Sequence, residues 1–312
     1  MRFVGLQMSE TGFPRHDPIP IGEIAAPPFA RLPDPHMIFA ARSLRFRTLA
    51  EGHQLAPYLL FLAAITECQH RIQTGLPEPD LPTDNARTRA REHAMPLLDR
   101  GRFTADVAFE VTLDRLLGLA ATVDMPDSAR AAIERSRGAD VATRRGMVRS
   151  VLAESIPVEA LADHVYIAAA LQVHFARLAA RLDAAALVRI GDGVCPVCGG
   201  APVASAIVGW TGSHGTRFCI CSLCATQWHV VRIKCVLCES TKGIGYEEVD
   251  GGPDTVKAEI CESCHGYVKI LHQHKNPQLE PFADDVATLG LDILLRENGY
   301  RRGAVNPFLL GY

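Results

Sequence analysis

The chain has 312 residues, of which 48% are hydrophobic and 21% are charged. These proportions are typical of a folded protein, and the length exceeds what one simple core usually holds, so we expect two or three domains and no extensive disorder. The formal net charge of -3 provides no overall attraction to nucleic acid or to an anionic membrane.

Residues 1–35 contain seven prolines. Proline lacks an amide donor and disfavours helix at the preceding residue, so this segment is predicted to be an extended, proline-rich arm. Its first six residues lead directly into polar sequence, without the apolar run of a secretory signal. We therefore expect a cytoplasmic protein.

Residues 36–190 are predicted to form a helical bundle, because apolar residues recur there at a spacing of three and four. The longest apolar run, residues 55–65, has 11 residues and contains Pro57, well short of the roughly 18 residues of a membrane span. We therefore expect no membrane insertion. The clearest helical patterns cover residues 55–65, 109–120 and a long stretch from Pro157 to Leu182, with a loop at residues 75–84.

Nine of the ten cysteines lie between Cys195 and Cys264, which favours metal ligation over disulfides in a reducing compartment. Eight of them form Cys-x-x-Cys pairs, and adding 40 to each residue number of the first two pairs gives the last two. A fixed offset of this kind indicates an internal duplication. The pairs are Cys195/Cys198, Cys221/Cys224, Cys235/Cys238 and Cys261/Cys264.

A Cys-x-x-Cys turn directs two thiolates at one point, and a second turn completes a tetrahedron of sulfurs. We therefore predict two sequential four-cysteine sites in rubredoxin-like or zinc-ribbon modules, over residues 191–232 and 233–275. Short hairpin strands are expected at residues 203–208, 229–233 and 267–271. The alternatives are interleaved pairing, as in RING-type modules, and redox-active dithiols.

Four sulfur ligands suit either zinc or mononuclear iron, and ligand type alone does not separate them. Such a site leaves no open coordination position, and we find no other catalytic motif, so the chain is not expected to be an enzyme. Cys219 corresponds to Glu259 in the second repeat and is not expected to be a ligand. His229 and His265 are interpreted as surface or supporting residues, and Trp228 as packing over the first site.

Residues 276–312 predict a C-terminal helix and tail. Phe282, Val286, Leu289 and Ile293 would form one apolar face of that helix. The tail at residues 306–309 is expected to dock on an apolar surface. The fold class is thus α plus small β: a helical bundle, two tandem four-cysteine modules and a C-terminal helix.

Several of these motifs together resemble the FdhE family of formate dehydrogenase accessory proteins. The combination, rather than any single Cys-x-x-Cys pair, carries the resemblance. Its elements are Leu32-Pro33-Asp34-Pro35, Cys195-Pro196-Val197-Cys198-Gly199, Pro202-Val203-Ala204-Ser205, Cys221-Ser222-Leu223-Cys224 with Trp228-His229, Lys234-Cys235, Val256-Lys257-Ala258-Glu259 and Asn306-Pro307-Phe308-Leu309.

The resemblance implies a cytoplasmic maturation factor for respiratory formate dehydrogenase that contacts the catalytic subunit. It also implies iron in rubredoxin-type sites, so we favour iron over zinc. A rubredoxin-like electron-transfer protein is an alternative. A zinc-ribbon nucleic-acid adaptor is disfavoured, because residues 191–275 contain 7 Lys and Arg against 8 Asp and Glu and lack a basic footprint.

Overall fold

The computed structural model describes residues 27–309. Most of the predicted proline-rich arm therefore lies outside the described residues. Its last part forms strand β1 (Ala30–Arg31), which joins the edge of the sheet beside Gln227 and Trp228. Asp34 then begins the first helix by accepting a hydrogen bond from the His36 N–H at 3.0 Å.

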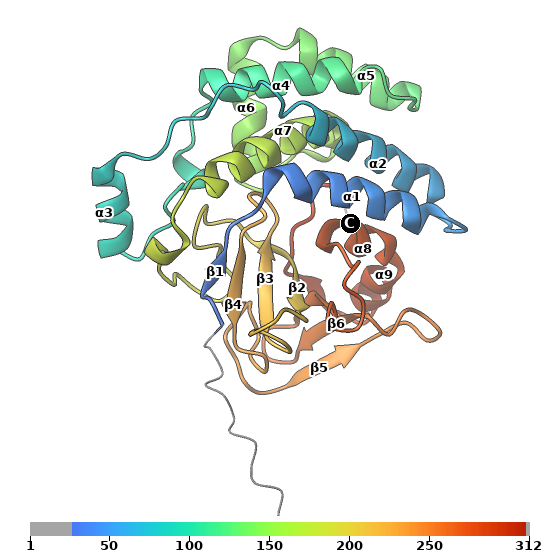
Figure 1. The fold of residues 1–312 in the computed structure, drawn as a ribbon. Helices are drawn as coiled ribbons and strands as arrows, with labels where there is room; N and C mark the ends of the chain where they lie inside the picture. Colours follow the sequence, from blue (N-terminus) through green and yellow to red (C-terminus); the bar gives the residue numbers. More distant parts are fainter. Residues whose placement is uncertain (1–26, 310–312) are drawn as a thin grey trace, which may run out of the picture.

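The predicted helical bundle is confirmed and forms a layer above the sheet (Figure 1). Helix α7 runs through its centre and packs against α4, α5 and α6. The helices of this layer are α1 (Pro35–Ala50), α2 (Ala56–Arg71), α3 (Asp84–Glu92), α4 (Val107–Ala120), α5 (Asp127–Gly138), α6 (Val141–Leu152) and α7 (Leu161–Ala180), with 3-10 turns at Arg100–Arg102, Val158–Ala160 and Ala184–Ala186.

In the cysteine-rich region the two predicted four-cysteine modules are present, and their strands are joined in one continuous sheet. Within the described chain its order is β1-β4-β3-β2-β7-β6-β5, with β8 pairing with β7. The strands are β2 (Pro202–Ile207), β3 (Arg217–Cys221), β4 (Gln227–Val230), β5 (Ile244–Glu247), β6 (Val256–Cys261), β7 (Gly266–Leu271) and β8 (Arg301–Arg302).

The duplication in the sequence is visible in this sheet. Strands β2, β3 and β4 recur about 40 residues later as β5, β6 and β7, and each set is an antiparallel three-stranded unit. The two units meet where β2 runs parallel to β7, with Ser205 opposite Ile270. The strand predicted at residues 229–233 extends too far, because β4 ends at Val230 and the next residues are exposed.

A buried ion pair also joins the two units. Arg217 on β3 makes a bidentate contact with the Glu259 carboxylate on β6, at 2.8 and 2.9 Å, and neither side chain is more than 3% exposed. The same guanidinium donates to the Lys234 carbonyl in the segment that links the units. Each polar atom brought into the core by this pair therefore has a partner, as burial of charge requires.

The single C-terminal helix predicted from the sequence is instead two helices, α8 (Pro281–Ala287) and α9 (Leu289–Glu297). At the break, the buried Lys269 ammonium donates to the carbonyls of Asp285 and Thr288, and the Thr288 hydroxyl donates to the Asp284 carbonyl. The change of direction turns Ile293 outward, where it is 40% exposed, and Leu291 and Leu295 are buried in its place.

The tail at residues 306–309 docks on an apolar surface, as expected. The Phe308 side chain is 1% exposed and meets the Phe46 ring edge-on at 6.1 Å. Its carbonyl accepts a hydrogen bond from Tyr58 on α2, at 2.5 Å. The tail thereby ties the C-terminal helices to the first two helices of the bundle.

Candidate metal centre

Each Cys-x-x-Cys pair lies in a tight turn, or knuckle. The residue after the second cysteine of each pair has a positive φ: 76° at Gly199, 57° at Ala225, 63° at Glu239 and 51° at His265. This left-handed step reverses the chain and lets the turn close on itself. At the first knuckle, the Gly199 N–H donates to the Cys195 carbonyl at 2.9 Å, and the duplicate bond from Glu239 to Cys235 has the same length.

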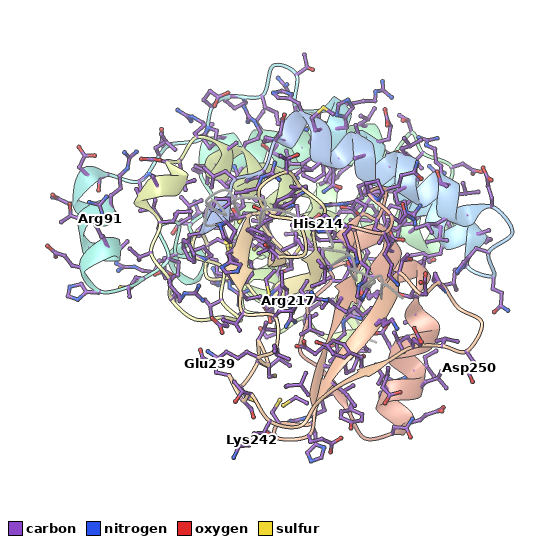
Figure 2. All side chains as sticks on the ribbon, turned by 60° about the horizontal axis from the view of Figure 1, so that its bottom comes forward. Arg91, His214, Arg217, Glu239, Lys242 and Asp250 are labelled. Atoms are coloured by element: carbon purple, nitrogen blue, oxygen red, sulfur yellow. The ribbon has the colours of Figure 1, made fainter. Side chains whose placement is uncertain are left out.

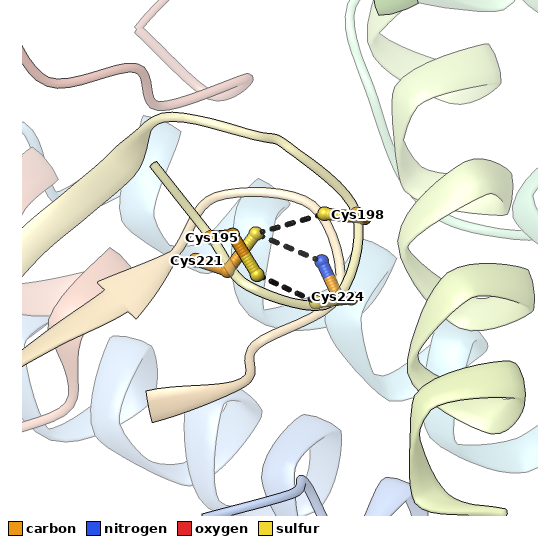
Figure 3. A group of neighbouring side chains, drawn as sticks. All are labelled: Cys195, Cys198, Cys221 and Cys224. Carbon is orange, nitrogen blue, oxygen red and sulfur yellow. Dashed lines mark hydrogen bonds between the residues drawn. The ribbon is translucent and has the colours of Figure 1, made fainter. Parts of the chain in front are cut away.

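The structure brings together the four sulfurs of the first set, Cys195, Cys198, Cys221 and Cys224 (Figure 3). All four residues are completely buried. The Cys195 and Cys224 sulfurs are 3.6 Å apart, and those of Cys198 and Cys221 are 3.4 Å apart. The backbone N–H groups of Leu223 and Cys224 point at the Cys221 sulfur, each at 3.4 Å.

The second set, Cys235, Cys238, Cys261 and Cys264, forms a separate group of the same design. The Cys235 and Cys264 sulfurs are 3.9 Å apart, and those of Cys238 and Cys261 are 3.7 Å apart. The Leu237 N–H points at the Cys235 sulfur at 3.4 Å. Within each group all ligand atoms lie within 4.8 Å of one another, so the grouping is sequential and not interleaved.

These distances fit a metal tetrahedron. Metal–sulfur bonds of about 2.3 Å place the sulfurs at the corners of a tetrahedron whose edges are about 3.8 Å long. The four sulfur–sulfur separations given above, 3.4 to 3.9 Å, lie close to that length. They are far longer than the roughly 2.05 Å of a disulfide bond.

Burial disfavours the charged form of the thiols in the first group, so four thiolates could share this site only with a cation beside them. Burial raises the pKa values of the Cys195 and Cys198 thiols well above normal. Cys221 is buried too, but hydrogen bonds from the other three thiols lower its pKa. In the second group burial raises the pKa of Cys261, but N–H groups of Cys264 and Ser263 outweigh this effect and lower it to about 7. Four thiolates in one buried group require a positive ion to compensate them.

The neighbouring residues occupy supporting positions. Cys219 lies on β3 between Ser205 and Trp228, outside both four-sulfur groups. Trp228 is 1% exposed, belongs to the same core cluster as the first group and donates its indole N–H to the Asp192 carbonyl at 2.8 Å. His229 is half-buried and packs against the Phe218 ring, while His265 is exposed.

The sequence pattern did not reveal how differently the two groups are surrounded. The first belongs to the large core that also holds residues of α1, α2, α4 and α7. The second lies partly at the surface, with Cys238 exposed and Cys264 half-buried. The spacing of the cysteines is the same in both repeats, so no feature of the motif itself could have distinguished them.

The architecture is therefore that of a helical domain followed by two tandem four-cysteine modules of the kind that hold a metal ion. Within the described residues, none of the helices combines the length and apolar character needed to cross a bilayer.

Comparison with known proteins identifies the family. Models of the FdhE N-terminal, central and C-terminal domains match residues 27–192, 194–232 and 233–309. The Protein FdhE homolog of Rhizobium meliloti (strain 1021) is 46% identical over 299 residues, which cover 95% of this chain and 97% of that protein. The homolog of Stutzerimonas stutzeri (strain A1501) is 38% identical, over 91% and 92%.

A solved structure agrees. The crystal structure of the FdhE protein from Pseudomonas aeruginosa matches with a TM-score of 0.82 and 33% identity, covering 91% of this chain and 99% of that one. The chain belongs to the FdhE family, which confirms the resemblance drawn from its motifs.

Proposed function

We propose that this protein is a cytoplasmic accessory factor that supports maturation of respiratory formate dehydrogenase by binding its catalytic subunit. The observation that carries the proposal is the match to all three FdhE domains over residues 27–309, including both four-cysteine groups. Its role is to bind and prepare an enzyme, not to catalyse a reaction, because a four-sulfur site has no vacant coordination position for a substrate.

In this proposal the eight cysteines hold two metal ions, one for each of the modules over residues 191–232 and 233–275. Iron is the preferred ion and zinc the alternative, since both accept four thiolates. A protein purified without oxygen should contain two metals per chain. Cys195→Ser and Cys235→Ser, which are duplicates of each other, should each lose about one. Loss of both metals from one substitution, with the fold intact, would contradict two independent sites.

The partner is tested by capture. A tagged chain expressed in anaerobically grown cells should retain the formate dehydrogenase catalytic subunit, and a strain lacking the protein should lose formate dehydrogenase activity. The control is an unrelated protein that carries the same tag and is purified from the same cells. If the unmodified chain captures no formate dehydrogenase subunit, the accessory function is wrong.

A rubredoxin-like electron-transfer role is the second candidate, and it is favoured by the sulfur separations near those of a metal tetrathiolate. Zinc has the same tetrahedral preference as iron in such a site but undergoes no redox change. Zinc-substituted protein that still binds its partner and still supports maturation would assign the metal a structural role. Protein that binds but no longer supports maturation would assign it electron transfer.

A further inference from the structure

The two cysteine groups have identical ligands but unequal access to solvent. Every cysteine of the first group is 0% exposed. In the second group each knuckle contributes one buried and one accessible ligand: Cys235 and Cys261 are 3% and 1% exposed, whereas Cys238 is exposed and Cys264 is half-buried. The second group therefore has an inner and an outer half.

The first group is enclosed by the helical domain. The Leu98 N–H donates to the Val197 carbonyl at 2.7 Å, so the loop before α4 is bonded to the first knuckle. On the other side, the Gln172 amide of α7 donates to the Ser222 carbonyl in the second knuckle at 2.9 Å. Both knuckles are thus held by partners outside the module, the half-buried Leu98 and the buried Gln172, and opening either one requires disruption of the main core.

The outer half of the second group has weaker support. The exposed Ser240 and Ser263 hydroxyls, one from each knuckle, are 3.0 Å apart, and each also lies within hydrogen-bond distance of the Lys242 carbonyl, at 3.1 and 3.4 Å. Their two hydroxyl hydrogens are shared among these three contacts. Water competes directly for such bonds. Glu239 and Lys242 lie at the edge of the fold remote from the helical layer (Figure 2). This edge can open while the rest of the fold persists.

We propose that the second group is the exchangeable metal centre of the protein and the first a permanent structural one. The inference rests on the proposed function, because it takes both groups to be metal centres. Metal would enter and leave the second group on the side bounded by Cys238 and Cys264. Accessible thiolates are the ones that a chelator, a competing thiol or an electrophile can reach in the folded protein.

The test is a chelator challenge of the full-length, metal-loaded protein under anaerobic conditions. EDTA is added, the metal remaining on the protein is counted at intervals, and reactive thiols are trapped with iodoacetamide and located by mass spectrometry. We expect one of the two metals to leave at least tenfold faster than the other. Label should appear first at Cys238 and Cys264, with the circular dichroism spectrum unchanged and the first group unlabelled.

A matched pair of variants removes the same ligand from each repeat. Cys238→Ser should lose about one metal and keep its helical circular dichroism, whereas Cys198→Ser should lose helical structure or fail to fold. If Cys198→Ser yields no soluble protein, the release and labelling pattern of the unmodified chain still decides the question. A Cys198→Ser protein that is as well folded as Cys238→Ser would overturn the inference.

The remaining outcomes separate the two proposals. Two metals that leave at the same rate, or label that appears first in the first group, overturn only the unequal roles of the centres. A protein that contains no metal after anaerobic purification and metal loading overturns metal binding itself, and the exchangeable centre with it.

Discussion

His174 should make the protein lose stability as the pH falls from 7.5 to 5.5. Its ring lies on α7, is 1% exposed and is surrounded by Phe103, Phe109 and Phe175 at centroid distances of 5.3, 5.7 and 6.1 Å. Among the described residues neither ring nitrogen has a hydrogen-bond partner. Burial lowers the pKa of His174 to about 4, an effect that the nearby Asp106 only partly offsets.

The sign follows from comparing the folded and unfolded chains. Above pH 6.5 the imidazole is neutral in both, so it contributes no pH dependence. Below that value the unfolded chain takes up a proton that the folded chain does not accept until about pH 4, so stability falls between these values. With pKa values of 6.5 and about 4, the loss between pH 7.5 and 5.5 is about 1.4 kcal/mol.

The measurement is urea unfolding at pH 7.5 and 5.5, followed by circular dichroism, for the unmodified protein and for His174→Leu. Protonation of the cysteine groups affects both proteins alike, so the comparison isolates the histidine. The unmodified protein should lose about 1.4 kcal/mol more than the variant. The exposed His93→Asn should behave like the unmodified protein. Equal losses in the unmodified protein and His174→Leu would refute the reasoning.

Three further sets of substitutions test the packing described above. His265→Gly should stabilise the protein by about 0.5–1 kcal/mol, because φ is 51° there and glycine adopts a positive φ without strain. Gly199→Ala should destabilise it, because φ is 76° at that position. Thermal unfolding that shows the reverse order would contradict the account of the knuckles. Arg217→Met should lower the free energy of unfolding in urea by about 3–5 kcal/mol, because it leaves Glu259 buried and unpaired. Adding Glu259→Leu should recover most of that loss. A double variant no more stable than the single one would argue against the ion pair. Phe308→Ala should cost about 3 kcal/mol by the same assay, and a cost below about 1 kcal/mol would mean that the tail is not part of the core.

The grouping of the cysteines could be predicted because it depends on local geometry. A Cys-x-x-Cys turn brings its two sulfurs together whatever surrounds it, and the 40-residue offset separates the pairs into two sets. The joining of the two sets into one sheet depends instead on the pairing of Ser205 with Ile270, which no local pattern encodes. Strands β3, β5 and β6 were not predicted. Arg217 on β3 and Glu259 on β6 are buried as an ion pair, and neither residue has its partner within its own repeat, so the pairing cannot be read from either strand alone.

The C-terminal helix shows the same limit. Residues 282–293 have a continuous helical pattern, and at the break the Thr288 carbonyl accepts a hydrogen bond from Lys269, which lies on a strand 19 residues earlier. Hydrogen bonds from a distant lysine to carbonyls at a helix end cannot be predicted from the sequence of that helix. The helices of the bundle could be predicted because the apolar periodicity lies within each helix itself. In α7, for example, 14 residues are buried.

The pairing of β1 with β4 has a consequence for the order of folding. Ala30 lies opposite Trp228, so 198 positions separate the partners. Bringing together two residues this far apart in the chain costs roughly 5 kcal/mol of chain entropy, and this cost precedes any stabilising contact between them. A ribosome releases the chain from its N-terminus, and the strand at Ala30 therefore has no partner until the first cysteine module has been made. Strand β1 therefore joins the sheet late in folding, although it is synthesised before every other strand of the described chain.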